Sequence, residues 1–174
     1  MKFDPSTVQT TVDSPLGTIV LAATDRGVAG LWFIDGQRYL PPQLMGGATW
    51  PEAGDHPVLK LASQQLADYF AGQRSDFDVP LDLRCGTPFQ QSVWQALLAI
   101  AHGDVVSYGE VSRRIGKPAA VRAVGGAIGR NPVSIIVPCH RVMGSQGALT
   151  GYAGGLERKT ALLRLEGALE EALA

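Results

Sequence analysis

The sequence predicts an α/β protein in two parts, an antiparallel sheet with one helix followed by a mostly helical half. Three short β-branched runs, at residues 8–12, 17–23 and 28–33, are separated by turn residues, which is typical of an antiparallel meander. Apolar residues at helical spacing over residues 58–70 then indicate an amphipathic helix lying on that sheet. From residue 87 onwards, capped helical segments replace the strands.

The change of composition places a domain boundary in the middle of the chain. We predict a sheet-plus-helix domain at residues 1–83, a linker at 84–86 and a helical domain at 87–174. Residues 35–56 carry no periodicity and are expected to form a surface loop. Residues 77–83 alternate apolar side chains with Asp and predict a further strand.

Two capping boxes open helices in the second half. Thr87 precedes a proline and is followed three residues later by Gln90, which predicts a helix reaching about residue 100. Ser107 and Glu110 repeat this spacing, and the short helix that they open is stopped by a Gly-Lys-Pro turn. A third helix is expected over residues 119–129. Two short helices around a glycine-containing turn are typical of a helix-turn-helix.

The third helix has unusually small side chains. Gly125 and Gly126 lie in its interior, where each glycine costs about 1 kcal/mol relative to alanine. Such a helix can approach another surface very closely, or it can simply pack against a neighbouring helix. Arg122 is its only long polar side chain, and Arg130 closes it.

Composition and charge narrow the class of protein. The 174 residues and 45% hydrophobic content fit a globular protein, and no apolar run approaches the about 18 residues of a membrane span, so we expect a soluble, unexported, cytoplasmic protein. Two cysteines cannot build a disulfide framework or a four-cysteine zinc site. Residues 84–166 hold ten Lys and Arg against four Asp and Glu, whereas residues 1–83 hold five against ten. A basic second half suits a polyanionic partner.

An apolar run at residues 135–137 reads as a buried strand that delivers Cys139, His140 and Arg141 side by side. These residues could hold a metal, could be a packed thiol beside a surface imidazole, or could be a nucleophile beside its base. A metal site lacks further ligands at usual spacing. Adjacent imidazole and guanidinium groups favour thiolate, so the sequence favours the nucleophile.

The last helix, expected over residues 156–166, carries a second polar candidate. Lys159, Leu163 and Glu166 fall on one face of it. If Leu163 faces the core, Glu166 needs a hydrogen-bonding or cationic partner, for which His140 or Arg141 is the candidate. A solvated glutamate at the helix end is the alternative.

Several separate segments carry a family resemblance. Residues 138–142 read Pro-Cys-His-Arg-Val, an Asn-Pro pair precedes them at 131–132, and Gly-Tyr-Ala-Gly-Gly-Leu and Leu-Glu-Gly follow at 151–156 and 165–167. In these features the chain resembles the O6-alkylguanine-DNA alkyltransferases, from about residue 87 to residue 167. The resemblance implies a ribonuclease-H-like amino-terminal domain and a helix-turn-helix domain with an active-site loop.

The resemblance also implies a reaction and its residues. Cys139 would accept the alkyl group of O6-alkylguanine, or of O4-alkylthymine, in a single turnover that makes the protein a suicide methyltransferase of DNA repair. His140, held by Glu166, would take the thiol proton through a water. Tyr108 would assist the departing base as a general acid, and Asn131 would brace the turn before the active site.

The implied partner is double-stranded DNA, bound by a monomer without metal or cofactor. The base is reached by flipping it out of the duplex, with Arg122 entering the vacated space from the minor groove. The expected DNA contacts are Arg122, Ala123, Gly125, Gly126, Ala127, Arg130 and Arg141. The expected pocket residues are Tyr108, Val142, Tyr152, Ala153, Gly154 and Lys159.

The chain departs from some relatives, and rival functions stay open. Ala153 is a serine in certain family members, which puts one hydrogen bond to the lesion in doubt. A protein of the alkyltransferase-like class binds lesions without repairing them, but it lacks the acceptor that Cys139 would provide. A helix-turn-helix regulator would prefer more base-reading side chains than Arg122 alone. A cysteine hydrolase would turn over an ester or a peptide.

Overall fold

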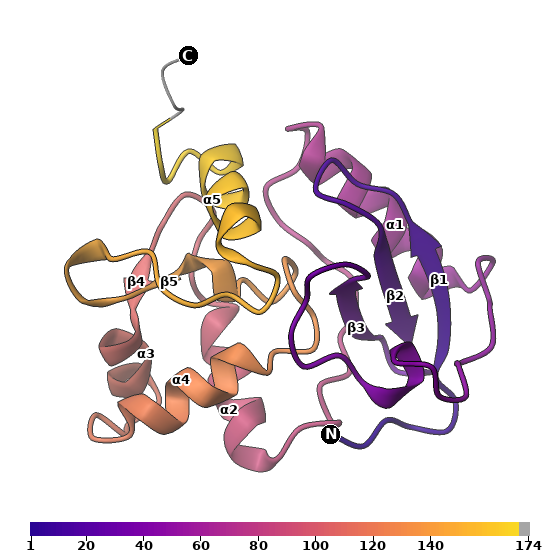
Figure 1. The fold of residues 1–174 in the computed structure, drawn as a ribbon, viewed down its shortest axis with the longest axis horizontal. Coiled ribbons are helices and arrows are strands. Elements are labelled where there is room, and N and C mark those ends of the chain that lie inside the picture. Colours follow the sequence, from indigo (N-terminus) through magenta and orange to yellow (C-terminus); the bar gives the residue numbers. More distant parts are fainter. Residues whose placement is uncertain (171–174) are drawn as a thin grey trace. The chain divides into compact units, whose positions relative to one another are not determined.

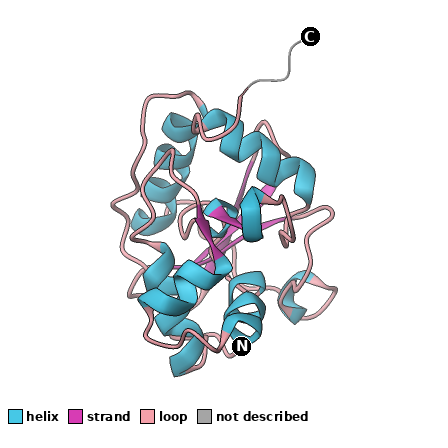
Figure 2. Cartoon of the chain, turned by 90° about the vertical axis from the view of Figure 1, so that its left-hand side faces the viewer, coloured by secondary structure: helices cyan, strands magenta, loops and turns pink. Residues whose placement is uncertain are grey.

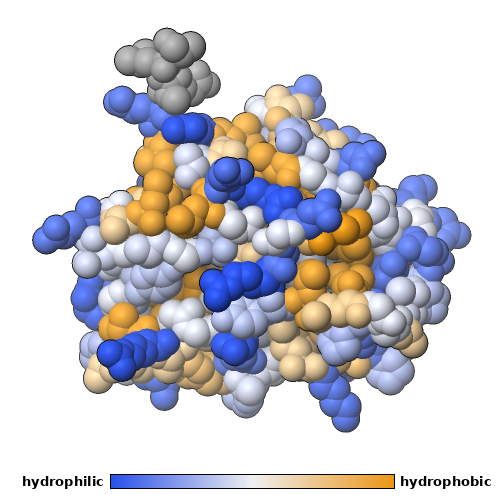
Figure 3. Space-filling view, in the orientation of Figure 1, coloured by the Kyte–Doolittle hydropathy of each residue, from blue (hydrophilic) through white to orange (hydrophobic). Residues whose placement is uncertain are grey.

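The computed structural model describes residues 1–170, and the chain separates into two compact units, Met1–Thr87 and Pro88–Ala174 (Figure 1). Residues 84–86 belong to the first unit, and their predicted role as a linker stays a prediction. Short helices and strands alternate with long loops (Figure 2). No described helix is long and apolar enough to cross a membrane. On the face drawn in Figure 3, hydrophilic residues interrupt the hydrophobic ones.

The first unit contains an antiparallel sheet in the order β1-β2-β3. Its strands are β1 (Val8–Val12), β2 (Ile19–Ala23) and β3 (Val28–Phe33), and α1 (Pro57–Phe70) packs on them. The predicted sheet with its amphipathic helix is therefore confirmed. Residues 77–83 do not form the expected strand, because only Leu81 bridges to the sheet, at Val28.

Every residue of β2 and β3 is buried, so both faces of the sheet are covered. On one face Trp32 stacks on Trp50 with 5.7 Å between ring centroids, and Phe3 meets both rings edge-on. Gly30 makes this possible, since a Cβ there would collide with the indole of Trp32. The cluster ties the chain start and the long loop to the sheet.

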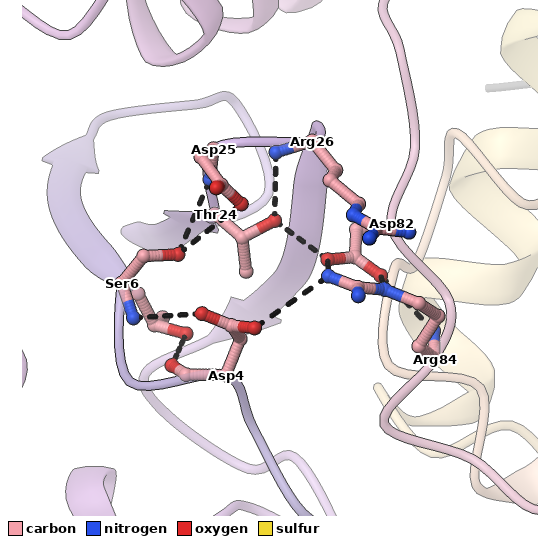
Figure 4. Close-up of polar contacts among 8 residues, drawn as sticks. Asp4, Ser6, Thr24, Asp25, Arg26, Asp82 and Arg84 are labelled. Atoms are coloured by element: carbon pink, nitrogen blue, oxygen red, sulfur yellow. Dashed lines mark hydrogen bonds and ion pairs between the residues drawn. The ribbon is translucent and has the colours of Figure 1, made fainter.

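An ion-pair network joins the start and the end of the first unit (Figure 4). Arg84 lies 2.7 Å from the Asp82 carboxylate and 3.6 Å from that of Asp4. The hydroxyl of Thr24 donates a 2.6 Å hydrogen bond to Asp82. Hydrogen bonds from Arg84 outweigh burial and hold the pKa of Asp82 well below its usual value. The next residue, Cys85, is half-buried, with its sulfur 3.9 Å from that of Met1.

The second unit is mostly helical, as predicted. Ser107 accepts the expected capping bond from the Glu110 amide at 3.0 Å, and α3 and α4 pack together as the helix-turn-helix requires. A short parallel pair of strands was not foreseen, with Val106 opposite Val142. The elements are α2 (Pro88–Leu97), β4 (Val106–Ser107), α3 (Tyr108–Arg114), α4 (Val121–Gly129), β5 (Val142–Met143) and α5 (Leu156–Leu165).

The apolar run before the cysteine is not a strand. Residues 134–136 form turns, although the whole run is buried, and Ile135 has a left-handed φ of 72°. The amide of Ile136 donates to the Ser134 carbonyl at 2.8 Å, and the amide of Val137 donates to that of Val133 at 3.0 Å. Burial alone does not distinguish a strand from a compact turn, which explains the wrong prediction.

Candidate active site

The turn that leads into the reactive stretch is held by Asn131. Its side-chain amide donates to the Val137 carbonyl at 2.8 Å, and its carbonyl oxygen accepts from the Val133 amide at 3.0 Å. Asn131 therefore spans both sides of the turn. A short 3₁₀-helix, Cys139–Arg141, follows directly, so the three predicted side chains leave a tight helical turn rather than an extended strand.

A buried carboxylate from α5 joins two of these side chains. Glu166 lies 2.9 Å from Nε2 of His140 and accepts hydrogen bonds from Nε and Nη2 of Arg141 at 2.7 and 2.8 Å. The guanidinium also donates to the Ile100 carbonyl at 2.6 Å. All three side chains are buried, so the solvated alternative for Glu166 is wrong and the predicted partners are both correct.

The charges in this network determine where the histidine proton lies. Burial would raise the pKa of Glu166, but hydrogen bonds from Arg141 and His140 outweigh it and hold that pKa well below its usual value. Burial lowers the pKa of His140, against the pull of Glu166. The imidazole is thus neutral near pH 7, with its proton on Nε2 facing the carboxylate. Nδ1 keeps a lone pair and has no hydrogen-bond partner among the described residues.

Cys139 is a protonated thiol in this environment. It is 5% exposed, and burial raises its pKa to about 11, against a hydrogen bond from Asn131 and the charge of Lys159. We expected neighbouring cations to favour thiolate, but the guanidinium of Arg141 is committed to Glu166 and Ile100 instead. A protonated thiol becomes nucleophilic only when a base takes its proton.

Lys159 crosses the site from α5 with its ammonium group buried. Nζ donates to the carbonyls of Val142, Thr150 and Gly151 at 2.6, 2.7 and 3.2 Å. Burial lowers its pKa to about 8. Lys159 and Val142 were predicted to line the pocket, yet both are fully buried, and the lysine instead ties β5 to the loop that follows it.

Tyr108, the first residue of α3, lies between two glycines. A Cβ on Gly125 would be 3.8 Å from its ring, and a Cβ on Gly151 would be 3.7 Å from its hydroxyl. Burial raises the pKa of the Tyr108 phenol, against a hydrogen bond with Thr150. The phenol therefore stays protonated and can donate a hydrogen bond.

The glycine-rich segment supplies the rest of the predicted pocket. Tyr152 and Gly154 are buried, and Ala153 is half-buried. Burial raises the pKa of the Tyr152 phenol well above its usual value. Gly155 adopts a φ of 94° where α5 begins, a conformation that favours glycine.

One of the two sequence interpretations of the small-residue helix α4 is confirmed, because one face of it packs against α2 and α3, whereas close approach to another surface stays a prediction. Val124, Ala127 and Ile128 are buried, and the Ala127 carbonyl accepts from the Trp94 indole at 2.8 Å. The predicted DNA contacts Ala127 and Arg141 therefore lie inside the fold, which removes them from the contact set. The exposed or half-exposed members of that set are Arg122, Ala123, Gly125, Gly126 and Arg130.

A groove of about 690 Å³ opens beside Tyr108, between α3, α4 and the loop after β5. Its lining residues are Ser107, Tyr108, Gly109, Arg113, Val121, Gly125, Ser145 and Gln146. Sequence reasoning missed Arg113, Ser145 and Gln146, because an arginine three residues after Glu110 looks like an ordinary surface ion pair. Within residues 1–170 no group of three or more His, Cys, Asp and Glu side chains could hold a metal ion.

Comparison with known proteins agrees with this geometry. Residues 88–168 match the DNA-binding domain of 6-O-methylguanine DNA methyltransferase, and residues 7–83 match the ribonuclease-like domain of the same family. The chain belongs to the 6-O-methylguanine DNA methyltransferase family. Its ribonuclease-like first half, which the sequence alone did not identify, is thereby shown.

Relatives from this methyltransferase family align with the chain over most of its length and most of their own. A methylated-DNA–protein-cysteine methyltransferase of Mycobacterium tuberculosis is 50% identical over 157 residues, 90% of either chain. One from Mycolicibacterium paratuberculosis is 49% identical over 156 residues, again 90% of either chain. A crystal structure of Mycobacterium tuberculosis OGT in complex with DNA superposes with a TM-score of 0.81 at 47% identity, over 92% of this chain and 93% of that one.

Proposed function

We propose that this protein repairs alkylated DNA by direct reversal, moving the alkyl group of O6-alkylguanine in duplex DNA onto Cys139. The observation that supports this most is a buried thiol preceding a neutral histidine that Glu166 holds with Nδ1 unpaired. The names of the 50% identical relatives point to the same reaction. As in the family, the protein would act once and without a cofactor.

The reaction is a displacement at the alkyl carbon. The sulfur of Cys139 forms a bond to that carbon while the bond from the carbon to O6 breaks. The thiol proton moves to Nδ1 of His140, through a water, and the protonated imidazole is stabilised by Glu166. Tyr108 donates a proton to the departing guanine, so that a neutral base leaves, and the phenolate of Tyr108 then takes up a proton from solvent. The products are a thioether on Cys139 and unmodified guanine.

Access to the base follows from α4. Its exposed glycine and alanine positions allow close approach to the minor groove, and Arg122 is exposed on the same helix. We propose that Arg122 fills the space left by the flipped nucleotide and that Tyr152, Ala153 and Gly154 form the base pocket. A cytoplasmic location and a monomeric state stay predictions.

The deciding experiment measures the mass of the cysteine peptides after reaction with duplex DNA containing O6-methylguanine. One methyl mass is expected on the peptide with Cys139 and none on the peptide with Cys85. An unmodified Cys139 beside an intact lesion overturns the proposal, and persistent turnover of an ester or peptide would support a hydrolase instead.

The flipping role has its own test in Arg122→Ala. This variant should lose far more activity on duplex DNA than on free O6-benzylguanine, because only the duplex requires extrusion of the base. Equal losses on the two substrates remove Arg122 from that role.

A further inference from the structure

The groove beside Tyr108 has a charge pattern that the reacting groups do not explain. Of the described residues that line it, Arg113 is the one charged side chain, and Ser145 and Gln146 add neutral hydrogen-bonding groups. Gly109 and Gly125 line the groove without adding side chains to its walls. An arginine beside neutral hydrogen-bonding side chains is a common contact set for the phosphate and sugar of a nucleic acid backbone.

The orientation of Arg113 leaves one edge of its guanidinium available. Nε and Nη2 donate to one oxygen of Glu110, at 3.1 and 2.8 Å. Nη1 lies instead over the first turn of α3, 3.5 Å from where a Cβ on Gly109 would be. Among the described residues no hydrogen bond to Nη1 is found. The side chain is 62% exposed, so Nη1 can reach a ligand without disturbing the core.

Glu110 does not neutralise this site. Its other oxygen accepts from Nε of Arg114 at 3.2 Å, so two arginines share one carboxylate. The three side chains leave a net positive charge at the wall of the groove. Hydrogen bonds from Arg113, and then from Arg114, lower the pKa of Glu110, so the carboxylate keeps both arginines fixed in place near pH 7.

We propose that Arg113 contacts the phosphodiester backbone of the strand that carries the lesion, next to the flipped nucleotide. The inference rests on the proposed function, because it takes the bound polyanion to be DNA. Its place follows from continuity with the reacting site. The same groove is lined by Tyr108, the proposed acid, and by Val121, the neighbour of Arg122. The contact would fix the position of the strand and would not read its sequence.

Arg114 offers a matched control. It lies on the same helix, pairs with the same carboxylate and is 40% exposed, but it does not line the groove. Arg113→Ala and Arg114→Ala therefore remove the same charge from the two sides of Glu110. Arg113→Lys keeps the charge on the groove side.

The experiment measures binding to duplex DNA containing O6-methylguanine over a range of salt concentrations, with Cys139→Ala as the common background to prevent transfer. Arg113→Ala should reduce the slope of log K against log salt by about 0.9, the value for one lost phosphate contact. Arg113→Lys should keep most of the slope. Arg114→Ala should leave it unchanged.

Reaction with free O6-benzylguanine, measured with Cys139 present, separates this inference from the proposed function. All three arginine variants should react like the parent protein, since that substrate has no phosphate. If the parent transfers alkyl groups but Arg113→Ala keeps the full salt slope, or if Arg114→Ala loses as much, Arg113 is not the phosphate contact. If the parent itself neither binds the duplex nor accepts an alkyl group, the proposed function fails instead.

Discussion

The regions around Cys85 and Cys139 resemble each other in the properties by which reactive cysteines are usually sought. Burial raises the pKa of each thiol to about 11. Each thiol also lies close in sequence to an arginine paired with a carboxylate, Arg84 with Asp82 and Arg141 with Glu166. By resting acidity alone the two cysteines are equivalent.

Their neighbours differ in what they can do with a proton. Besides burial, the charge of the amino terminus lowers the pKa of Cys85 and that of Asp82 raises it, and the sulfur lies 3.9 Å from that of Met1. Around Cys139, a hydrogen bond from Asn131 and the charge of Lys159 lower the thiol pKa, and the next residue is a neutral histidine whose Nδ1 has no hydrogen-bond partner among the described residues. If Cys139 is the nucleophile, a neighbouring proton acceptor rather than a low thiol pKa distinguishes it from Cys85.

The largest effect should come from removing each thiol in turn. Cys139→Ala is expected to abolish alkyl transfer while keeping DNA binding, and Cys85→Ala should retain both. Transfer is followed by the mass of the protein after reaction with lesion-containing duplex, and binding is followed by gel shift. Loss of transfer in Cys85→Ala would break the comparison, because the two thiols would then both take part.

The two carboxylates should differ next. Glu166→Gln leaves the buried Arg141 without a countercharge and should lower the free energy of unfolding by about 3–5 kcal/mol. Asp82→Asn should cost only about 1 kcal/mol, because its partner Arg84 is 42% exposed and is solvated when unpaired. Urea unfolding near pH 7 measures both. Equal costs would show that leaving the buried Arg141 unpaired costs no more than leaving the half-exposed Arg84 unpaired.

The pH dependence of the free energy of unfolding gives a second test of Glu166→Gln. A carboxyl whose folded pKa lies below its unfolded value of about 4.5 adds stability above that pH, and the contribution is lost as the pH falls below it. As the pH falls below 4.5, the free energy of unfolding of the parent protein should therefore decrease more steeply than that of Glu166→Gln. Parallel curves would contradict the lowered pKa of Glu166.

A smaller effect concerns the pH at which transfer fails. Because the pKa of His140 is below 6.5, the imidazole stays neutral and transfer to Cys139 should hold its rate from pH 8 down to 6.5, falling only below that. Labelling of Cys85 by iodoacetamide requires thiolate and should instead decrease throughout this range, since the pKa of Cys85 is about 11. A transfer rate that follows the labelling rate would remove His140 as the proton acceptor.

The smallest effect is expected for Lys159→Met. Lys159, whose pKa is about 8, is charged at pH 7 and there favours the Cys139 thiolate. Its removal should therefore shift the rate of iodoacetamide labelling of that thiol at pH 7 downward, by about tenfold or less. Cys85 serves as the internal control in the same protein and should not shift. A shift of both thiols would indicate a general loosening of the fold.

Much of this architecture was predictable because it depends on local chemistry. The capping hydroxyl of Ser107 and the helical spacing that brings Glu166 to the core can both be read from neighbouring residues. Contacts between segments far apart in the sequence could not be predicted from neighbouring residues. The bridge between Val106 and Val142 and the three carbonyls around Lys159 depend on how the loops close, and no short pattern encodes that.

The wrong predictions share one physical cause. The family resemblance suggested that Arg141 contacts DNA and that Lys159 lines the base pocket, but in each case the fold satisfies the charged group internally. Likewise the apolar residues before Cys139 are buried in a turn rather than in a strand. Residue type predicts what a side chain needs, and the fold decides which group meets that need.

The left-handed conformation of Ile135 has a consequence for the lifetime of the protein. A β-branched residue at φ 72° carries about 1–3 kcal/mol of backbone strain, which the hydrogen bonds of Asn131 across the turn hold in place. An alkyl group on the packed sulfur of Cys139 would push on the same turn. We expect the alkylated protein to be less stable and to melt at a lower temperature than the unreacted protein. The strained turn that presents the thiol would then also mark the spent molecule for removal.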